Sequence, residues 1–244
     1  MQNFKKKLKI YKDKKILITG HTGFKGSWLS FWLNSLGGRI YGISDGIPTK
    51  PSFFKACKVD RLSKNFYFDL KNSFKVKKTI NKIKPDFIFH LAAQSLVSKS
   101  YNDPDQTWET NLIGTKNVLG ALLNYKKKCT VVVVTSDKCY KNIETHRPYD
   151  ETDILGGIDP YSASKASAEI LFNSYYQSFF KNSKYVSLAS ARAGNVIGGG
   201  DWARDRLIPD CVKLWHRNKR VKIRSPKATR PWQHVLEALS GYLL

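Results

Sequence analysis

Three glycines directly after an apolar segment constrain the fold more than any other feature of the chain. Residues 15–19 (KILIT) form a run that predicts a buried strand. They lead into GHTGFKG at residues 20–26, and residues 24–36 then predict a helix that ends before Gly37-Gly38. In a strand–turn–helix context, such glycines let the backbone turn sharply and approach a pyrophosphate, which lies on the helix N-terminus. The segment therefore predicts a dinucleotide site.

Strand and helix patterns alternate along most of the chain. The β-branched strand segments between helices predict a parallel, doubly wound α/β sheet buried on both faces. After Ala193 the pattern changes, so we predict a dinucleotide-binding domain over residues 1–193 and a partial substrate-binding domain over residues 194–244. Further strands are predicted over 39–43, 66–69, 86–91, 130–134, 185–190 and 221–224, and further helices over 71–84, 105–125, 159–180 and 207–215.

Residues at the ends of the predicted strands would complete the cofactor site. Asp45 lies 19 residues after Gly26, close to the roughly 20 expected for an acid on a ribose 2′-hydroxyl, which favours NAD over NADP. The alternative is that Asp45-Gly46 is only a turn. Lys25 either adds charge near the phosphates or is a surface lysine. The candidate cofactor residues are Gly20, His21, Gly23, Phe24, Lys25, Gly26, Asp45, Asp69, Leu70, Leu91, Ala92, Ala93, Gln94, Asn111, Tyr161 and Lys165.

A second motif, YSASK at residues 161–165, opens a predicted helix after the fifth strand. The four-residue offset places Tyr161 and Lys165 on one helical face. A nearby ammonium stabilises the tyrosinate and lowers the tyrosine pKa, and bound NAD+ adds positive charge, so Tyr161 becomes a usable base near neutral pH. Ser136, just after the fifth strand, completes a hydroxyl–tyrosine–lysine set. The C-terminal edge of the sheet, where these residues lie, is where ligands bind in such folds.

The chain is strongly basic, with 42 Lys+Arg against 19 Asp+Glu and a formal charge of +23. The lysines are scattered and no RNP, zinc-finger or helix-turn-helix pattern accompanies them, so we predict a solvated surface and neither a nucleic-acid nor a membrane partner. The four cysteines form no CxxC pair and predict no metal site. No apolar signal core or membrane-length apolar run is present in the sequence, so a cytoplasmic location is predicted.

Several segments together resemble one known family. GHTGFKGSW, LAAQ, TSDKCY, YSASK, RAGNVIGGGDW with DRLIPD, and ATRPWQHV are similar to the CDP-glucose 4,6-dehydratases, which are extended short-chain dehydrogenases/reductases, from about Lys14 to the last residue. The resemblance implies a Rossmann-type fold, a tightly held NAD and a hydro-lyase that converts CDP-glucose to CDP-4-keto-6-deoxyglucose. It also implies deoxysugar biosynthesis for lipopolysaccharide O-antigen. It further implies a homodimer that pairs through helices 105–125 and 159–180.

The same resemblance assigns the catalytic roles. Related dTDP- and GDP-sugar enzymes have hydroxyl-Asp-Glu after the fifth strand, whereas this chain has Ser136-Asp137-Lys138, which resembles the CDP-glucose branch. Tyr161 would remove the C4 hydroxyl proton while hydride leaves C4. A neutral Lys138 would take the C5 proton, and a protonated Asp137 would donate to the departing C6 hydroxyl. The alternative for Lys138 is a surface ion pair with Asp137.

On the substrate side, the resemblance implies arginines that hold a diphosphate through planar, bidentate contacts and a tryptophan that stacks on a sugar or base. The candidate substrate-binding residues are Arg192, Asn195, Asp201, Trp202, Arg206, Arg230 and Trp232.

Some features depart from the family pattern. Ser95 and Ala238 stand where prolines are expected, and the sequence stops at Leu244 inside a predicted helix, so a shortened chain or a fragment is expected. Two alternatives stay open. One is another nucleotide-sugar dehydratase or epimerase, and the other is a catalytically impaired NAD-binding relative.

Overall fold

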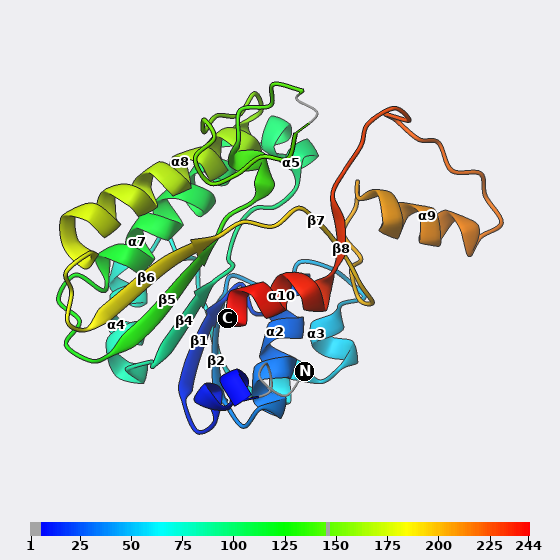
Figure 1. Ribbon diagram of the computed structural model, residues 1–244. Coiled ribbons are helices and arrows are strands. Elements are labelled where there is room, and N and C mark those ends of the chain that lie inside the picture. The colour runs from blue at the N-terminus through cyan, green and yellow to red at the C-terminus, as the bar shows by residue number, and fades with distance from the viewer. Residues whose placement is uncertain (1–5, 145–146) are drawn as a thin grey trace.

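The computed structural model describes residues 6–144 and 147–244, and it is built around a six-stranded parallel sheet (Figure 1). The strand order is β3-β2-β1-β4-β5-β6, so the order reverses between β1 and β4. This is the arrangement of a doubly wound Rossmann-type sheet, which confirms the predicted fold class. The strands are β1 (Lys15–Thr19), β2 (Arg39–Ser44), β3 (Ser63–Tyr67), β4 (Phe87–His90), β5 (Cys129–Val134) and β6 (Val186–Ala191).

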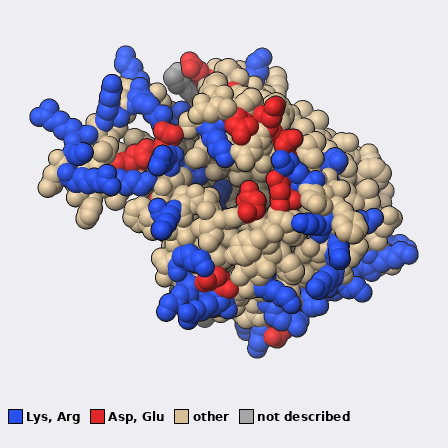
Figure 2. All heavy atoms as spheres, turned by 180° about the vertical axis from the view of Figure 1, so that it is seen from behind, with Lys and Arg blue, Asp and Glu red and all other residues tan. Residues whose placement is uncertain are grey.

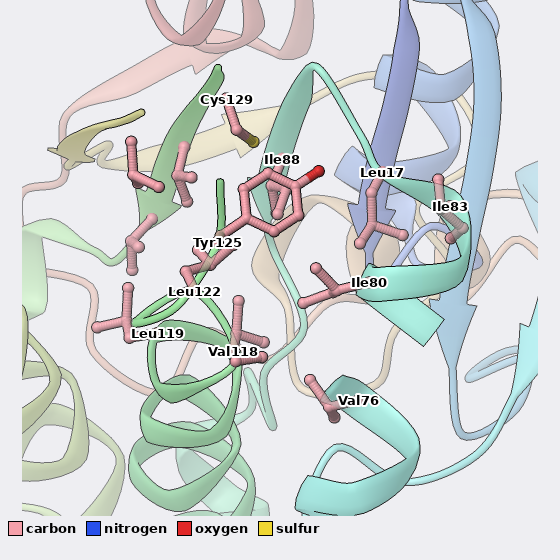
Figure 3. Close-up of a cluster of buried hydrophobic side chains, with 14 of the residues drawn as sticks. Leu17, Val76, Ile80, Ile83, Ile88, Val118, Leu119, Leu122, Tyr125 and Cys129 are labelled. Carbon is pink, nitrogen blue, oxygen red and sulfur yellow. The ribbon is translucent and has the colours of Figure 1, made fainter. Parts of the chain in front are cut away.

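Helices cover both faces of the sheet (Figure 1). The cluster on one face joins Leu17 and Ile88 of the strands to Ile80 of α4 (Ser73–Ile83) and Leu119 of α7 (Gly114–Gly120), as Figure 3 shows. Neighbouring residues Ile18 and Phe89 point to the other face, because side chains alternate along a strand. There they meet α2 (Phe24–Ser35) and α10 (Val235–Leu243). Burial on both faces explains why the strands read as continuous apolar runs.

Of the predicted strands, the third is shifted and the last is not formed in the described part of the chain. The third was expected over 66–69, but β3 is Ser63–Tyr67, because the polar residues Ser63, Lys64 and Asn65 lie alongside β2 at the edge of the sheet. Asp69 and Leu70 therefore lie beyond that strand. Residues 221–224 are irregular, and no strand pairs with them in the described part of the chain.

The two predicted long helices are interrupted. The segment 105–125 consists of α6 (Pro104–Trp108), a π-helical turn (Glu109–Ile113) and α7, and 159–180 consists of α8 (Pro160–Tyr175) and a second π-helical turn (Tyr176–Phe180). Local helix patterns do not distinguish these hydrogen-bonding schemes, and π turns often occur at functional sites. The other helices are α3 (Phe53–Ala56), α5 (Val97–Asn102) and α9 (Leu207–Trp215), with 3-10 helices over Lys9–Tyr11, Val59–Arg61 and Asp137–Cys139.

A second, two-stranded sheet begins the C-terminal region. β7 (Asn195–Ile197) pairs in parallel with β8 (Trp232–His234). The intervening residues 198–231, here called the arm, include α9 and project away from the main sheet (Figure 1). The chain then returns, and α10 packs Val235, Leu239 and Leu243 beside α2 in the core of the main sheet. The domain division at residue 193 stays a prediction.

None of the helices in the described ranges combines the length and apolar character needed to span a membrane.

Candidate active site

The turn between β1 and α2 requires glycine at two positions. Gly20 has a φ of +72°, and a Cβ there would lie 2.8 Å from the backbone of Ala92. A Cβ on Gly26 would lie 2.1 Å from the carbonyl oxygen of Gly20. The first turn of α2 therefore packs on the loop itself, and the loop packs on the segment that follows β4.

The start of α2 fits a negatively charged group. Gly23 is the N-cap, and among the described residues no side chain caps the helix and no acidic residue lies in its first turn. The amides of the first turn are therefore oriented as in anion-binding helix N-termini. Asp45 is exposed directly after β2, at the same C-terminal edge of the parallel sheet.

His21 uses its side chain within the protein. The imidazole is buried and hydrogen-bonds Asn65 at 2.8 Å and Ser44 at 3.0 Å. Burial lowers its pKa, although the hydrogen bond with Asn65 acts in the opposite direction. A Cβ on Gly42 would lie 2.1 Å from the imidazole ring. The ring therefore braces the glycine loop against β2 and β3, which leaves the backbone of His21 as the part that can face a cofactor.

The residues predicted to do chemistry meet at the C-terminal end of β5. Asp159 caps α8 by accepting a hydrogen bond from the Ser162 amide at 2.9 Å. Tyr161 and Lys165 are buried on that helix, and Tyr161 hydrogen-bonds Ser136. The Lys165 ammonium donates to the carbonyl oxygen of Val134 at 3.5 Å. The structure thus brings together the predicted hydroxyl–tyrosine–lysine set.

The pKa values in this set depend mainly on burial. Burial raises the pKa of Tyr161, and the hydrogen bond with Ser136 only partly opposes it. Burial and the nearby charge of Lys25 lower the pKa of Lys165 to about 8. In the protein by itself, burial therefore opposes the predicted lowering of the tyrosine pKa, because loss of water outweighs the nearby positive charge.

Asp137 and Lys138 lie in the 3-10 helix directly after Ser136. The Ser136 hydroxyl donates to Asp137 Oδ1 at 3.0 Å and accepts from the Lys138 amide at 3.3 Å. Both side chains are half-buried. Within residues 6–144 and 147–244, no ion pair joins them, so the surface-pair alternative for Lys138 finds no support.

Gln94 and Asn111 join the segment after β4 to α8. Asn111 Oδ1 accepts from the Gln94 amide at 2.8 Å, and its Nδ2 donates to the Ser164 hydroxyl at 2.8 Å. Asn111 lies in the π-helical turn before α7 and is buried. Leu91, Ala92 and Ala93 belong to the same loop segment, which closes the site beside the glycine turn.

Lys25 extends toward the reaction centre. Its ammonium donates to the Tyr242 hydroxyl of α10 at 3.2 Å. Burial lowers the pKa of Lys25 to about 8, with Arg206 acting in the same direction and Asp137 opposing. Arg206 itself pairs with Asp201 at 2.8 Å and donates to Ser95 at 3.1 Å. Of the two predicted roles for Lys25, the one on a free surface is therefore wrong.

Half-buried Arg192 forms an ion pair with buried Glu169. Its Nη2 is 3.0 Å from Glu169 Oε2, its Nε donates to Oε1, and its Nη1 donates to the Tyr140 hydroxyl. All three nitrogens thus have partners within the chain, so a contact with a diphosphate would have to share them. Sequence reasoning missed Glu169, although it lies four residues after Lys165 and hence on the same helical face.

The other predicted substrate residues lie on or beside the arm. Asn195 and Trp232 face each other in the register of β7 and β8, and Arg230 is exposed. The arm carries ten Lys or Arg and three Asp, and Figure 2 shows this gathering of basic side chains. A cavity of about 440 Å³ adjoins α9 and is lined by Lys50, Pro51, Trp202, Arg204, Asp210, Lys213 and Arg217.

Comparison with known proteins places this site in a family. The family model described as GDP-mannose 4,6 dehydratase matches residues 17–244. The chain belongs to that dehydratase family. The match covers the sheet, the helix α8 that carries Tyr161 and Lys165, and the arm.

Two curated proteins illustrate the similarity of this chain to known enzymes. A CDP-glucose 4,6-dehydratase of Salmonella typhimurium is 46% identical over 96% of this chain and 66% of its own length. A CDP-paratose 2-epimerase of Salmonella typhi is 30% identical over 78% of this chain and 59% of its own length. The first match confirms the predicted resemblance. The chain spans less than two thirds of the length of these relatives.

Solved structures confirm the fold of the family. A dTDP-glucose 4,6-dehydratase of Streptomyces venezuelae, crystallised with NAD, superposes with a TM-score of 0.81 at 21% identity, over 93% of this chain and 70% of that one. A UDP-glucose 4-epimerase of Thermotoga maritima gives a TM-score of 0.81 at 21% identity, over 92% of this chain and 71% of that one.

Proposed function

We propose that the protein is a CDP-glucose 4,6-dehydratase that forms CDP-4-keto-6-deoxyglucose with NAD as its cofactor. The observation that carries the proposal is that the Ser136 hydroxyl contacts Tyr161, the Asp137 carboxylate and the backbone amide of Lys138, so these residues lie together. An epimerase needs a tyrosine and a lysine but no additional acid and base for elimination. The 46% identity to a curated CDP-glucose 4,6-dehydratase supports the same substrate.

The residues divide into two groups in this mechanism. Tyr161 accepts the proton of the C4 hydroxyl, with Ser136 and Lys165 orienting it and stabilising its anion. Lys138 accepts the C5 proton, which the 4-keto group has made acidic, and Asp137 donates a proton to the departing C6 hydroxyl. Positioned acids and bases of this kind contribute about a hundredfold to ten-thousandfold each. Bound NAD would supply the acceptor for the C4 hydride and return it to C6, and Lys138 then gives its proton back to C5.

The cofactor proposal relies on the open helix N-terminus and on Asp45. The amides at the start of α2 would hold the pyrophosphate, and Asp45 would bind the ribose hydroxyls. Asp69 and Leu70 would lie near the adenine. Calorimetric titration is expected to show tighter binding of NAD than of NADP. Tighter binding of NADP would overturn the role of Asp45, and binding of neither would overturn the dinucleotide site.

A panel of nucleotide sugars tests the substrate. We expect a 4-keto-6-deoxy product from CDP-glucose and little or none from dTDP-, GDP- and UDP-glucose. A preference for another nucleotide would make the protein a sister dehydratase. A C4-inverted sugar without loss of water would make it an epimerase. Cofactor binding without any reaction would support the catalytically impaired relative.

Lys138→Ala tests the division of labour in the same assay. Oxidation at C4 should continue, so NADH absorbance should accumulate on adding substrate, while the 6-deoxy product falls by about a hundredfold or more. Unchanged product formation in Lys138→Ala, beside an active unmodified protein, would show that Lys138 is not the base.

We propose in addition a homodimer that pairs through the helical segments 105–125 and 159–180. Large apolar side chains are exposed there, including Ile113 at 38%, Ile170 at 60% and Phe179 at 55%, and such patches often mark protein interfaces. Light scattering should give twice the chain mass at micromolar concentration, whereas a stable monomer would contradict the dimer. A cytoplasmic location, a partial nucleotide-sugar-binding domain over residues 194–244 and a role in O-antigen deoxysugar synthesis belong to the same proposal.

A further inference from the structure

The proposed mechanism leaves one buried carboxylate without a role. Glu169 is 4% exposed and lies on α8 one turn beyond Lys165. Its Oε1 accepts from Arg192 Nε at 3.1 Å and from the Thr135 hydroxyl, and its Oε2 accepts from Arg192 Nη2 at 3.0 Å and from Ser190 at 3.2 Å. Four donors on two oxygens fix the carboxylate more tightly than an ordinary salt bridge.

The partners of Glu169 and Arg192 lie at both ends of one catalytic segment. Thr135, bound by Glu169, directly precedes Ser136. Tyr140 directly follows the Asp137–Cys139 helix, and its hydroxyl accepts from Arg192 Nη1 at 2.9 Å. The Arg192 guanidinium also lies over the Tyr140 ring, 4.9 Å from its centroid. The segment 135–140 is therefore held at its start by the carboxylate and at its end by the guanidinium.

The same ion pair is fixed to the helix that carries the tyrosine and lysine. Tyr161, Lys165 and Glu169 follow at four-residue intervals and so share one face of α8. Buried ion pairs add little stability compared with apolar packing, because desolvation offsets the attraction. The planar, bidentate geometry of an Arg–carboxylate pair does fix relative position, which is the property that a two-part active site requires.

We propose that the Glu169–Arg192 pair is a positioning clamp that sets the segment carrying Asp137 and Lys138 against the helix carrying Tyr161 and Lys165. The inference rests on the proposed dehydratase function, since it assigns elimination to the first segment and oxidation to the helix. In this proposal Glu169 and Arg192 are positioning residues, which act through the segments that they hold.

The clamp also acts on the charge of Lys165. Burial alone would raise the pKa of Glu169, but hydrogen bonds from Arg192 and Thr135 outweigh burial and keep the pKa below its usual value. The ionised carboxylate opposes the lowering of the Lys165 pKa. The charged and titratable groups that act on Lys165 are Glu169 from its own helix, Lys25 from α2, Cys139 from the 3-10 helix and His90 from β4. Tyr161 shares the helical face of Lys165.

Glu169→Gln and Arg192→Met test the clamp, with Lys55→Met as the matched control. Lys55 forms an exposed ion pair with Asp60 at 2.8 Å, far from the catalytic residues in sequence and on a different helix. Hydrogen exchange read by mass spectrometry needs no activity. We expect amides of residues 135–140 to exchange at least tenfold faster in Glu169→Gln and Arg192→Met. The same amides should be unchanged in Lys55→Met.

Enzyme kinetics distinguish a positioning role in catalysis from a purely structural role. Both clamp variants should lower kcat about a hundredfold with little change in KM, because misplacement by about 1 Å has this effect. Arg192→Lys keeps the charge but not the planar fork, so it should recover only part of the loss. Glu169→Gln should also move the titration of Lys165 to lower pH, measured by competitive acetylation of that amine, because the opposing carboxylate charge is gone.

The outcomes are distinct. Faster exchange with unchanged kcat and unchanged Lys165 titration would reduce the pair to a structural brace and overturn the inference, as would unchanged exchange. A raised KM confined to Arg192→Met would make Arg192 a substrate ligand and also overturn it. If the unmodified chain turns over no sugar nucleotide, the proposed function fails. The exchange and acetylation results then still decide whether the clamp exists.

Discussion

The main sheet buries its large apolar side chains, whereas the arm leaves large apolar side chains exposed. In the sheet and its helices, residues such as Ile16, Leu33 and Leu239 are fully buried. In the arm, Val212 is 52% exposed and Trp215 62% exposed, and Cys211 is the buried residue of α9. The groups assigned to chemistry therefore rest on a packed scaffold, whereas many groups assigned to substrate recognition lie on a segment with little packing of its own.

The two regions therefore differ in how firmly they hold their side chains in position. A packed core holds side chains in defined rotamers, so the positions of Tyr161 and Lys165 follow from folding alone. An exposed segment opens locally at low free energy, so contacts made by Trp202 and Arg230 are expected to depend on what they bind. Reaction geometry and substrate affinity should therefore respond to different mutations.

The largest expected contrast compares Tyr161→Phe with Arg230→Ala. Removing the hydroxyl base should lower turnover by about a hundredfold to ten-thousandfold, while NAD binding by calorimetry stays almost unchanged because the ring still packs. Arg230, exposed on the arm, should mainly affect KM. Turnover of Tyr161→Phe at the unmodified rate would refute the role of Tyr161, and a loss confined to kcat in Arg230→Ala would remove the contrast.

Stability should separate the two regions next. Leu239→Ala removes a fully buried side chain from the cluster beside α2, and such truncations cost about 2–5 kcal/mol. Val212→Ala removes an exposed side chain and should change the free energy of unfolding by less than about 0.5 kcal/mol. Urea denaturation measures both, and equal losses would mean that the arm is packed as tightly as the core.

The buried ammonium of Lys165 should reduce stability at neutral pH. Its pKa falls from the usual 10.5 to about 8 in the folded protein, so the unfolded chain binds more protons between these values and stability rises with pH there. Below pH 8 the buried ammonium lowers the free energy of unfolding by about 3 kcal/mol. Lys165→Met should therefore raise the thermal midpoint at pH 7 while it abolishes turnover. A lower midpoint at pH 7 would contradict this account.

The smallest expected contrast uses two glycines. A methyl group at Gly26 would meet the Gly20 carbonyl, whereas a Cβ on Gly199 of the arm would meet nothing within 4 Å. Gly26→Ala should therefore lower the free energy of unfolding by about 1–3 kcal/mol, the usual range for overpacking, and weaken NAD binding. Gly199→Ala should leave both unchanged. A stable Gly26→Ala protein with normal NAD affinity would show that the loop adapts.

The sequence pattern was sufficient to predict the parts of the site that a few consecutive residues form. The glycine turn and the Tyr161–Lys165 spacing were recognised because strand, turn and helix signals follow one another directly. The edge strand β3 was shifted in the prediction, since its polar residues become a strand only by pairing with β2. The π-helical turn that places Asn111 had no recognisable sequence signal.

The sequence by itself determined the sheet, the order of the helices beside it and the residues that gather at its C-terminal edge, because the alternation of apolar strand segments and helix patterns is a local property of the chain. Only the tertiary structure determined which partners the long charged side chains contact. Lys25 meets Tyr242 from the far end of the chain, and Arg192 pairs with Glu169 across the end of the sheet. It also decided that burial raises the pKa of Tyr161. These outcomes depend on which residues exclude water from a site, and that is set by segments distant in sequence.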